Sequence, residues 1–126
     1  MVTKKKTKEG EPLCPLRHLS NTFGGKWKLP ILCILSSGEK PKRYSVIKRR
    51  LGDVTNVMLS QSLHELEAAG LVHREQYNEV PPRVEYSLTE KGKIALPFLG
   101  QAAAWAIEDM KASSIEVFCD PCATMT

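Results

Sequence analysis

The spacing of hydrophobic residues changes abruptly at Gly70, and this change limits the possible folds more than any other feature. Over 56–69 the leucines recur at helical spacing. Over 71–77 and 83–88 the residue types and their spacing are typical of β-strands. The five residues between these strands, Asn-Glu-Val-Pro-Pro, favour a stiff hairpin turn. The sequence therefore predicts a helix followed directly by a β-hairpin.

Three shorter helices are expected before this helix, over about 13–23, 26–35 and 45–51. Residues 42–44 form a strand that is too short for more than a single ladder contact. Ser45 is the expected N-cap of the helix that follows. Two helices joined by a tight turn and followed by a hairpin are the element order of a winged helix-turn-helix.

The ends of the later helices carry clear signals. Thr55 is the expected N-cap of the helix over 56–69, and Gly70 stands where a left-handed C-cap residue belongs. Thr89 is expected to cap a long final helix, and Pro97 should kink that helix or lie near its start. The predicted fold class is mostly α with a small β-hairpin (α+β), with helices outside the winged domain at both ends.

The length of 126 residues is enough for one domain and too short for two ordinary ones. We expect a disordered basic tail at 1–12, one domain at 13–112 and a C-terminal tail at 113–126. No apolar run approaches the ~20 residues of a membrane span, and the basic N-terminus lacks the apolar stretch of a signal peptide. A cytoplasmic chain with reduced thiols and no membrane partner is therefore expected.

The net charge of +4 is modest but unevenly distributed. Between residues 39 and 50, six cations accompany one anion. Such a basic segment suggests a polyanionic partner, usually nucleic acid, although a solvated helix face is the alternative. On double-stranded DNA, the residues expected to contact backbone phosphates are Lys42, Arg43, Ser45, Lys48, Arg49 and Thr55.

The helix over 56–69 has two chemically different faces. Leu59, Leu63 and Leu66 form an apolar stripe at about 100° per residue, and the opposite face is small, polar and uncharged. Glutamine can bind adenine through two hydrogen bonds, and valine can contact the methyl group of thymine. An ordinary amphipathic helix has the same stripe, but the flanking turn and hairpin favour DNA reading. The expected base-reading residues are Asn56, Val57, Ser60, Gln61 and His64.

Arg83 follows Pro81 and Pro82 at the tip of the predicted hairpin. A rigid tip that carries one guanidinium group suits insertion into a narrow minor groove. The alternative is an arginine paired with Glu79 or Glu85, and composition alone does not separate the two.

Several blocks of the sequence resemble the HxlR family of transcriptional regulators. They span about residues 13–110 and occur in the order of that family: CPL at 14–16, GGKW at 24–27, LSQSLHELE at 59–67, GLV at 70–72, VPPRVEYSLT at 80–89, LP at 96–97 and Trp105. The GGKW and PPRVEYSLT blocks are specific motifs. The resemblance implies a MarR-like winged-helix homodimer that binds palindromic operators.

The resemblance also implies that the first and last helices build the dimer interface. Both helices carry more apolar surface than one small domain can bury, although packing within one subunit is the alternative. One departure from the family is the segment 78–79, because Glu79 gives the wing tip an acidic group. The residues expected at the interface are Leu16, Leu19, Leu99, Trp105 and Ile107.

Some members of the family sense oxidants, quinones or aldehydes through a cysteine at the start of the first helix, and Cys14 matches that position. Thiols at helix N-termini are often reactive. The alternative for Cys14 is a small packing residue. Cys33 lies within an apolar pattern and is expected in the core.

Two other classes of function are weighed against a DNA-binding regulator. A winged-helix domain can bind proteins instead of DNA, and Cys119 and Cys122 form a CxxC that suits a thiol-redox role or half of a zinc site. The sequence has no catalytic constellation and no phosphate-binding loop, so we expect no enzyme activity, cofactor or metal. The leading prediction is a homodimeric, sequence-specific DNA-binding regulator that responds to an oxidant, an electrophile or a small ligand.

Overall fold

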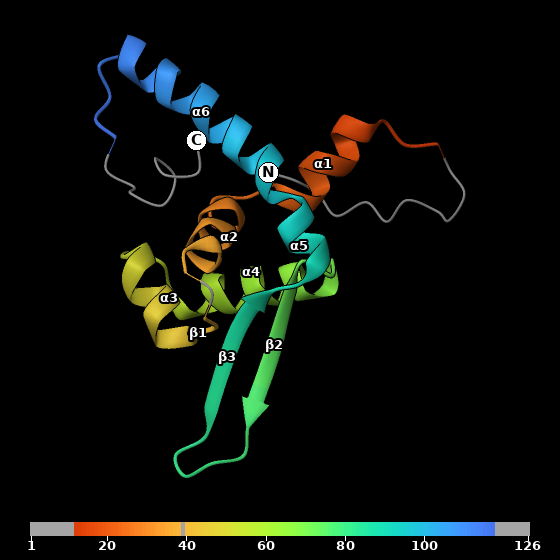
Figure 1. Cartoon of the computed structure of the whole chain (residues 1–126), viewed down its shortest axis with the longest axis vertical. Helices are drawn as coiled ribbons and strands as arrows, with labels where there is room; N and C mark the ends of the chain where they lie inside the picture. The colour runs from red at the N-terminus through yellow and green to blue at the C-terminus, as the bar shows by residue number, and fades with distance from the viewer. Residues whose placement is uncertain (1–11, 39, 118–126) are drawn as a thin grey trace.

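The computed structural model describes residues 12–38 and 40–117. Within these ranges, Figure 1 shows a β-hairpin that projects from one end of the molecule and two helices, α1 and α6, at the opposite end. The predicted order of a helix followed by a hairpin is confirmed, and the fold is a winged helix-turn-helix. The elements are α1 (Pro15–Phe23), α2 (Lys28–Ser36), β1 (Lys42–Arg43), α3 (Tyr44–Leu51), α4 (Asn56–Ala68), β2 (Val72–Tyr77), β3 (Arg83–Leu88), α5 (Glu90–Ile94) and α6 (Leu96–Ala112).

The hydrophobic core lies between α2, α3, α4 and the base of the sheet. The predicted stripe of α4, formed by Leu59, Leu63 and Leu66, is at most 1% exposed. It belongs to one buried cluster with Ile31 of α2 and Ile47 of α3. Burying a leucine side chain stabilises a fold by about 1.5–3 kcal/mol. The stripe therefore fixes which face of α4 points to solvent.

The sheet has three strands in the order β1-β3-β2. β2 and β3 are antiparallel along their whole length, from Val72 opposite Leu88 to the pair next to the turn. β1 adds two further pairs, Lys42 with Tyr86 and Arg43 with Glu85. The prediction of a single ladder contact for this short strand is therefore wrong, and the wing is joined to the start of α3.

Both predicted ends of α4 are confirmed. The Thr55 side chain accepts a hydrogen bond of 3.1 Å from the main-chain N–H of Met58, which satisfies one of the free donors of the first turn. Gly70 has a φ of +79°, the left-handed conformation that glycine adopts without steric cost. The N–H of Leu71 then donates to the carbonyl of Leu66 over 3.0 Å, which closes the helix.

The predicted N-cap of α3 is wrong. The helix begins at Tyr44, Arg43 occupies the N-cap position without a capping side-chain hydrogen bond, and Ser45 lies inside the first turn. Because Lys42 and Arg43 are paired with β3, the chain stays extended until Tyr44. The end of strand pairing, rather than the best capping side chain, sets the start of this helix.

The final helical region is divided into α5 and α6. Thr89 caps α5 by accepting a hydrogen bond of 3.0 Å from the N–H of Gly92, as predicted. Pro97 lies in the first turn of α6, where a missing N–H costs no helical hydrogen bond. The ring centroids of Phe23 in α1 and Phe98 in α6 are 5.9 Å apart, so the two helices are in contact.

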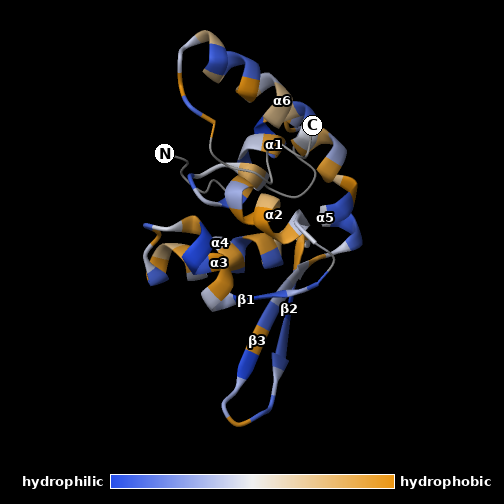
Figure 2. Ribbon diagram, turned by 60° about the vertical axis from the view of Figure 1, so that its left-hand side comes forward, coloured by the Kyte–Doolittle hydropathy of each residue, from blue (hydrophilic) through white to orange (hydrophobic). Residues whose placement is uncertain are grey.

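The helices α1 and α6 extend beyond the winged domain. No residue of α1 is buried. Figure 2 shows apolar residues along α6 at the end of the molecule opposite the hairpin. No helix among the described residues is long and apolar enough to cross a membrane.

Candidate nucleic-acid interface

The outer face of α4 presents the residues that the sequence analysis selected. Val57 is 74% exposed, and Gln61 and His64 are also exposed. The exposed Val57 side chain contributes little to the stability of this fold, since the leucine stripe already anchors the helix. These residues form a small, uncharged and partly apolar surface, which suits the edges of base pairs.

The N-terminal half of α4 is tied to α3 by one tyrosine. The hydroxyl of Tyr44 donates toward the main-chain oxygen of Asn56 at 3.2 Å and toward its Oδ1 at 3.1 Å. It also lies 3.4 Å from Oγ of Ser60. Both of these predicted base-reading residues are exposed. Tyr44 therefore fixes the two helices relative to each other at the end of α4 that carries the polar residues.

Gln61 is held on the other side of α4. Its Nε2 donates a hydrogen bond of 3.1 Å to Oε2 of Glu65, and Oε1 of Glu65 forms an ion pair of 2.8 Å with Nζ of Lys28 in α2. The three residues line a cavity of about 460 Å³ together with Met58 and Trp27. Neither Lys28 nor Glu65 was predicted from the sequence. The one available signal was the i, i+4 spacing of Gln61 and Glu65.

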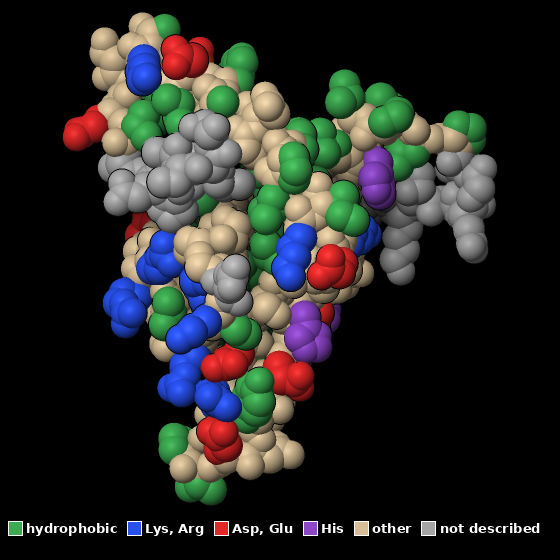
Figure 3. All heavy atoms as spheres, in the orientation of Figure 1, with side chains coloured by type: hydrophobic (Ala, Val, Ile, Leu, Met, Phe, Trp, Pro, Cys, Tyr) green, Lys and Arg blue, Asp and Glu red, His purple; other side chains and the backbone are tan. Residues whose placement is uncertain are grey.

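The basic segment before α4 forms a cationic surface on α3 and the neighbouring part of the wing, where blue side chains gather in Figure 3. Arg43 and Arg49 are exposed, and Lys48 is partly exposed. Within the described residues, the structure records no ion pair for these three side chains. Arg50 donates a hydrogen bond of 3.0 Å to Oγ of Ser37, which joins α3 to the end of α2.

Lys42 differs from its neighbours although it carries the same charge. Its ammonium group donates to the carbonyl of Ser37 and, over 3.3 Å, to the carbonyl of Lys40. Burial and, to a lesser degree, the nearby guanidinium of Arg50 lower the pKa of Lys42 below its ordinary value of 10.5. The structure therefore turns this predicted phosphate contact toward the main chain, and Lys42 serves to hold the loop before β1.

Arg83 is engaged within the wing. Its guanidinium group lies 3.0 Å from Oε1 of Glu79 and 3.5 Å from Oε2 of Glu85, and it stacks 4.1 Å from the ring centroid of Tyr77. Arg83 is half-buried at the start of β3, and the fully exposed residue at the tip is Val80. The alternative of an arginine paired with these two glutamates is the arrangement found.

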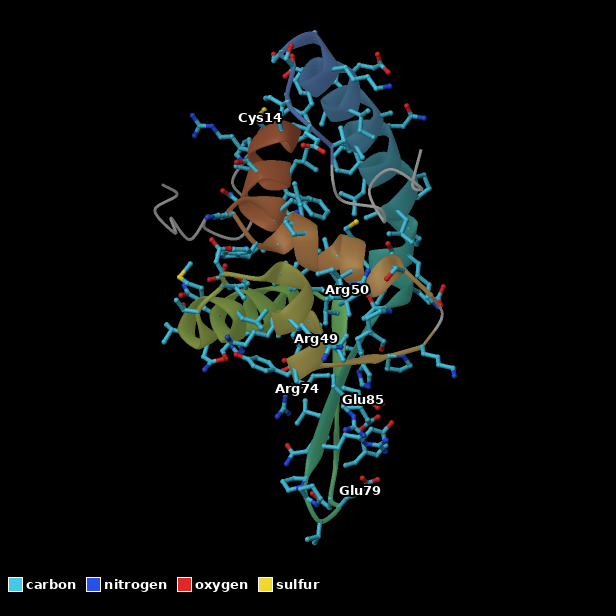
Figure 4. All side chains as sticks on the ribbon, turned by 90° about the vertical axis from the view of Figure 1, so that its left-hand side faces the viewer. Cys14, Arg49, Arg50, Arg74, Glu79 and Glu85 are labelled. Atoms are coloured by element: carbon cyan, nitrogen blue, oxygen red, sulfur yellow. The ribbon has the colours of Figure 1, made fainter. Side chains whose placement is uncertain are left out.

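A second arginine of the wing was not predicted. Arg74 of β2 is exposed and lines a shallow pocket with Ser60, His64, Glu67 and Tyr86, between the wing and α4. Figure 4 shows Arg74 at about the same level of the hairpin as Glu85, whereas Glu79 lies near the tip. The one sequence signal for Arg74 was its position in the strand directly after α4, whereas its place opposite the buried Tyr86 follows from the sheet register.

The residues predicted for a dimer interface fall into two groups. Leu16 of α1 and Trp105 of α6 are 72% and 71% exposed, although both are large and apolar. Leu19 and Ile107 are partly buried. Leu99 is only 7% exposed and belongs to the core of the winged domain, so the chain itself already covers it.

Cys14 is exposed at the N-cap position of α1. In Figure 4 it lies at the far end of the molecule from Glu79. Cys33 is buried in α2, as predicted. Cys119, Cys122 and nearly all of the predicted tail at 1–12 lie outside the described residues. The described residues contain no group of three or more His, Cys, Asp or Glu side chains that could hold a metal ion.

Comparisons with known proteins agree on one class. The model of a family described as HxlR-like helix-turn-helix matches residues 22–114. An uncharacterized HTH-type transcriptional regulator from Methanothermobacter thermautotrophicus is 48% identical over 97 residues, which are 77% of this chain and 72% of that protein.

Two solved structures are equally close in fold. The putative HTH-type transcriptional regulator ytcD is 39% identical with a TM-score of 0.74, over 79% of this chain and 99% of ytcD. The redox regulator HypR in its reduced form is 38% identical with a TM-score of 0.74, over 80% of this chain and 98% of HypR.

Proposed function

Because the chain belongs to the HxlR-like helix-turn-helix family and is a DNA-binding transcriptional regulator rather than an enzyme, we propose that it acts as a homodimer on a palindromic operator. In this proposal α4 lies in the major groove, and Val57, Gln61 and His64 face the base edges. The observation that carries the proposal is the outer face of α4, which is uncharged and partly apolar while its leucine stripe is buried. We place this activity in the cytoplasm, with the chromosomal DNA.

Phosphate contacts come from the cationic surface beside α4. We assign them to Arg43, Lys48 and Arg49, with Ser45 and Thr55 as neutral donors at the helix starts. Arg74 at the base of the wing joins this set. These contacts position α4 on the duplex and supply affinity for any sequence. Lys42 is left out because its ammonium group is held by main-chain carbonyls.

The second copy of the chain is proposed to pack on α1 and α6. Leu16 and Trp105 are exposed there, and Leu19 and Ile107 are partly exposed beside them. Exposed aromatic and aliphatic side chains of this size are typical anchors of protein interfaces. A twofold dimer would present two copies of α4 to half-sites one helical turn apart, roughly 34 Å.

The signal is proposed to act on Cys14. HypR is a redox regulator solved in reduced and oxidized forms. The Cys14 thiol is exposed at the start of α1, within the proposed dimer region. The thiolate would attack one oxygen of hydrogen peroxide, so that an S–O bond forms, the O–O bond breaks and the other oxygen leaves as hydroxide. The resulting sulfenic acid makes this position more polar. Replacing Cys14 by serine should abolish any oxidant-dependent change in operator affinity. Unchanged sensitivity in the serine variant would overturn this part of the proposal.

Salt titration of DNA binding tests the proposed function. The logarithm of the binding constant should fall linearly with the logarithm of salt concentration, by about 0.9 per phosphate contacted. Binding should also be tighter to one duplex sequence than to others at each salt concentration. Binding that is absent, or that does not respond to salt, would instead favour a protein-interaction role for the winged domain.

A further inference from the structure

Gln61 belongs to a chain of three side chains that runs from the core to the outer face of α4. Lys28 lies on α2 and its side chain is only 11% exposed, while the side chain of Glu65 is 21% exposed. One carboxylate oxygen of Glu65 pairs with Nζ of Lys28 at 2.8 Å, and the other accepts from Nε2 of Gln61 at 3.1 Å. The chain thus connects a buried charge to an exposed amide.

This arrangement determines which way the amide of Gln61 faces. A carboxylate can only accept hydrogen bonds, so the amide nitrogen of Gln61 must point toward Glu65, and its carbonyl oxygen must point away. The amide nitrogen keeps its second N–H, and the oxygen keeps its capacity to accept. These are the two groups that bind adenine together, with the oxygen accepting from N6 and the nitrogen donating to N7.

Burial of the Lys28–Glu65 ion pair separates this chain from an ordinary surface pair on a helix, while the Gln61–Glu65 hydrogen bond lies at its exposed end. Exposed side chains at i and i+4 exchange partners with water and hold each other weakly. The carboxylate of Glu65 is largely removed from water and is fixed by a lysine that is itself buried. A charged group in such surroundings makes a strong and directional hydrogen bond. Glu65 therefore restrains Gln61 before any DNA arrives.

We propose that Glu65, anchored by Lys28, is a positioning residue for base recognition: it fixes the orientation of the Gln61 amide so that this position of the operator is read as adenine. The inference rests on the proposed function, because it assumes that α4 reads bases. Without the carboxylate, the Gln61 amide can rotate by about 180°, which exchanges the positions of its nitrogen donor and its oxygen acceptor. The amide then no longer selects a single base.

The test measures affinity for four duplexes that differ only in the base pair at the position read by Gln61. Glu65→Gln keeps the shape of the side chain but can donate as well as accept, so it tolerates both orientations of the Gln61 amide. We expect the preference for adenine to fall by about fivefold in this variant. Gln61→Ala should remove the preference, and adding Glu65→Gln to Gln61→Ala should not change it further.

Two controls separate positioning from charge and from folding. Glu108→Gln removes the same charge from an exposed position of α6, far from α4, and it should leave the base preference unchanged. Lys28→Met should relax the preference as Glu65→Gln does, and Lys28→Arg should restore it. Thermal unfolding identifies variants that fail to fold. If Lys28→Met does not fold, the test rests on Glu65→Gln alone. That substitution should relax the base preference when residue 61 is glutamine and have no effect on it when residue 61 is alanine.

The outcomes distinguish this inference from the proposed function. A Glu65→Gln variant that weakens all four duplexes equally, or that acts equally in the Gln61→Ala background, would overturn the positioning role. A Gln61→Ala variant that keeps the full preference would overturn both the reading role of Gln61 and the inference built on it. Relaxed preference in Gln61→Ala with full preference in Glu65→Gln would overturn the inference alone.

Discussion

Single side chains of the basic segment carry the same charge but differ in what they can contact. Arg49 extends into solvent from α3, whereas the ammonium group of Lys42 is bound to carbonyls of the preceding loop. The excess of lysine and arginine over acidic residues in this segment predicts a cationic surface, and a cationic surface is found. The direction of Lys42 depends on the β1–β3 pairing, which no local pattern reveals.

Replacing Lys48 by alanine tests the phosphate role of α3. The variant should bind every duplex more weakly by a similar factor, and the slope of log affinity against log salt should decrease in magnitude by about 0.9. The measurement is a salt titration on two unrelated duplexes. Lys111→Ala is the matched control, because Lys111 lies on α6 and pairs with Glu108 at 3.7 Å. A loss confined to one duplex would contradict the phosphate role.

The residues that sequence reasoning missed share one property, which is that their role depends on a distant partner. Glu65 gains its role from Lys28, which is 37 positions earlier in the printed sequence. Arg74 is near α4 because of the strand register. In contrast, the outer face of α4 follows from the spacing of three leucines in one helix, so Val57 and Gln61 were predictable.

At the scale of elements, the wing is less cationic than its role in a DNA complex would suggest. Arg83 is shared by Glu79 and Glu85, and the exposed tip residue, Val80, is apolar. This pairing weakens the attraction between the wing and phosphates, because the charge of the arginine is already compensated. Arg74 at the base of the wing is the wing arginine that lines a pocket with residues of α4.

Replacing Glu79 by glutamine should therefore increase DNA affinity. Arg83 then loses one of its two carboxylate partners, and one negative charge near the duplex disappears. We expect affinity for all sequences to rise by roughly two- to fivefold at low salt, and the gain to shrink at high salt. Glu108→Gln on α6 removes the same charge far from the wing. Equal affinities for the two variants would show that the wing tip does not approach the DNA.

The elements that the sequence predicted have local signals, whereas the start of α3 has none. The hairpin, the capped ends of α4 and the Thr89 cap follow from residue spacing and from hydrogen bonds within a few residues. The start of α3 depends instead on pairing between β1 and a strand more than 40 residues away. Pro97 permits either a kink or a new helix start, and the structure has a new start.

At the scale of the whole molecule, the core of the winged domain and the exposed ends of α1 and α6 are separate. Leu99 is in the core, whereas Trp105, six residues later on the same helix, is largely exposed. Dimerisation through these helices would bury Trp105 and Leu16 without rearranging the core. The sequence predicted apolar excess on both helices, but it could not tell which residues the chain itself covers.

Replacing Trp105 by glutamate should shift the protein toward monomers without unfolding it. A charge at the centre of an interface must be desolvated, which strongly disfavours association. Sedimentation measures the oligomeric state, and urea unfolding measures stability. Leu99→Ala is the contrasting variant, because a cavity in the core lowers the free energy of unfolding by about 2–5 kcal/mol. A Trp105→Glu protein that sediments as the native dimer would place the interface elsewhere.

Selection of bound sequences from random duplex DNA tests the central claim most directly. The account predicts a palindrome whose half-sites are about one helical turn apart, roughly 34 Å, with one position in each half-site that loses its preference when Gln61 is replaced by alanine. The same selection with an oxidant should give a changed enrichment in the native protein and an unchanged enrichment in Cys14→Ser. Recovery of unrelated sequences with no shared motif would contradict the claim that this chain is a sequence-specific dimeric regulator.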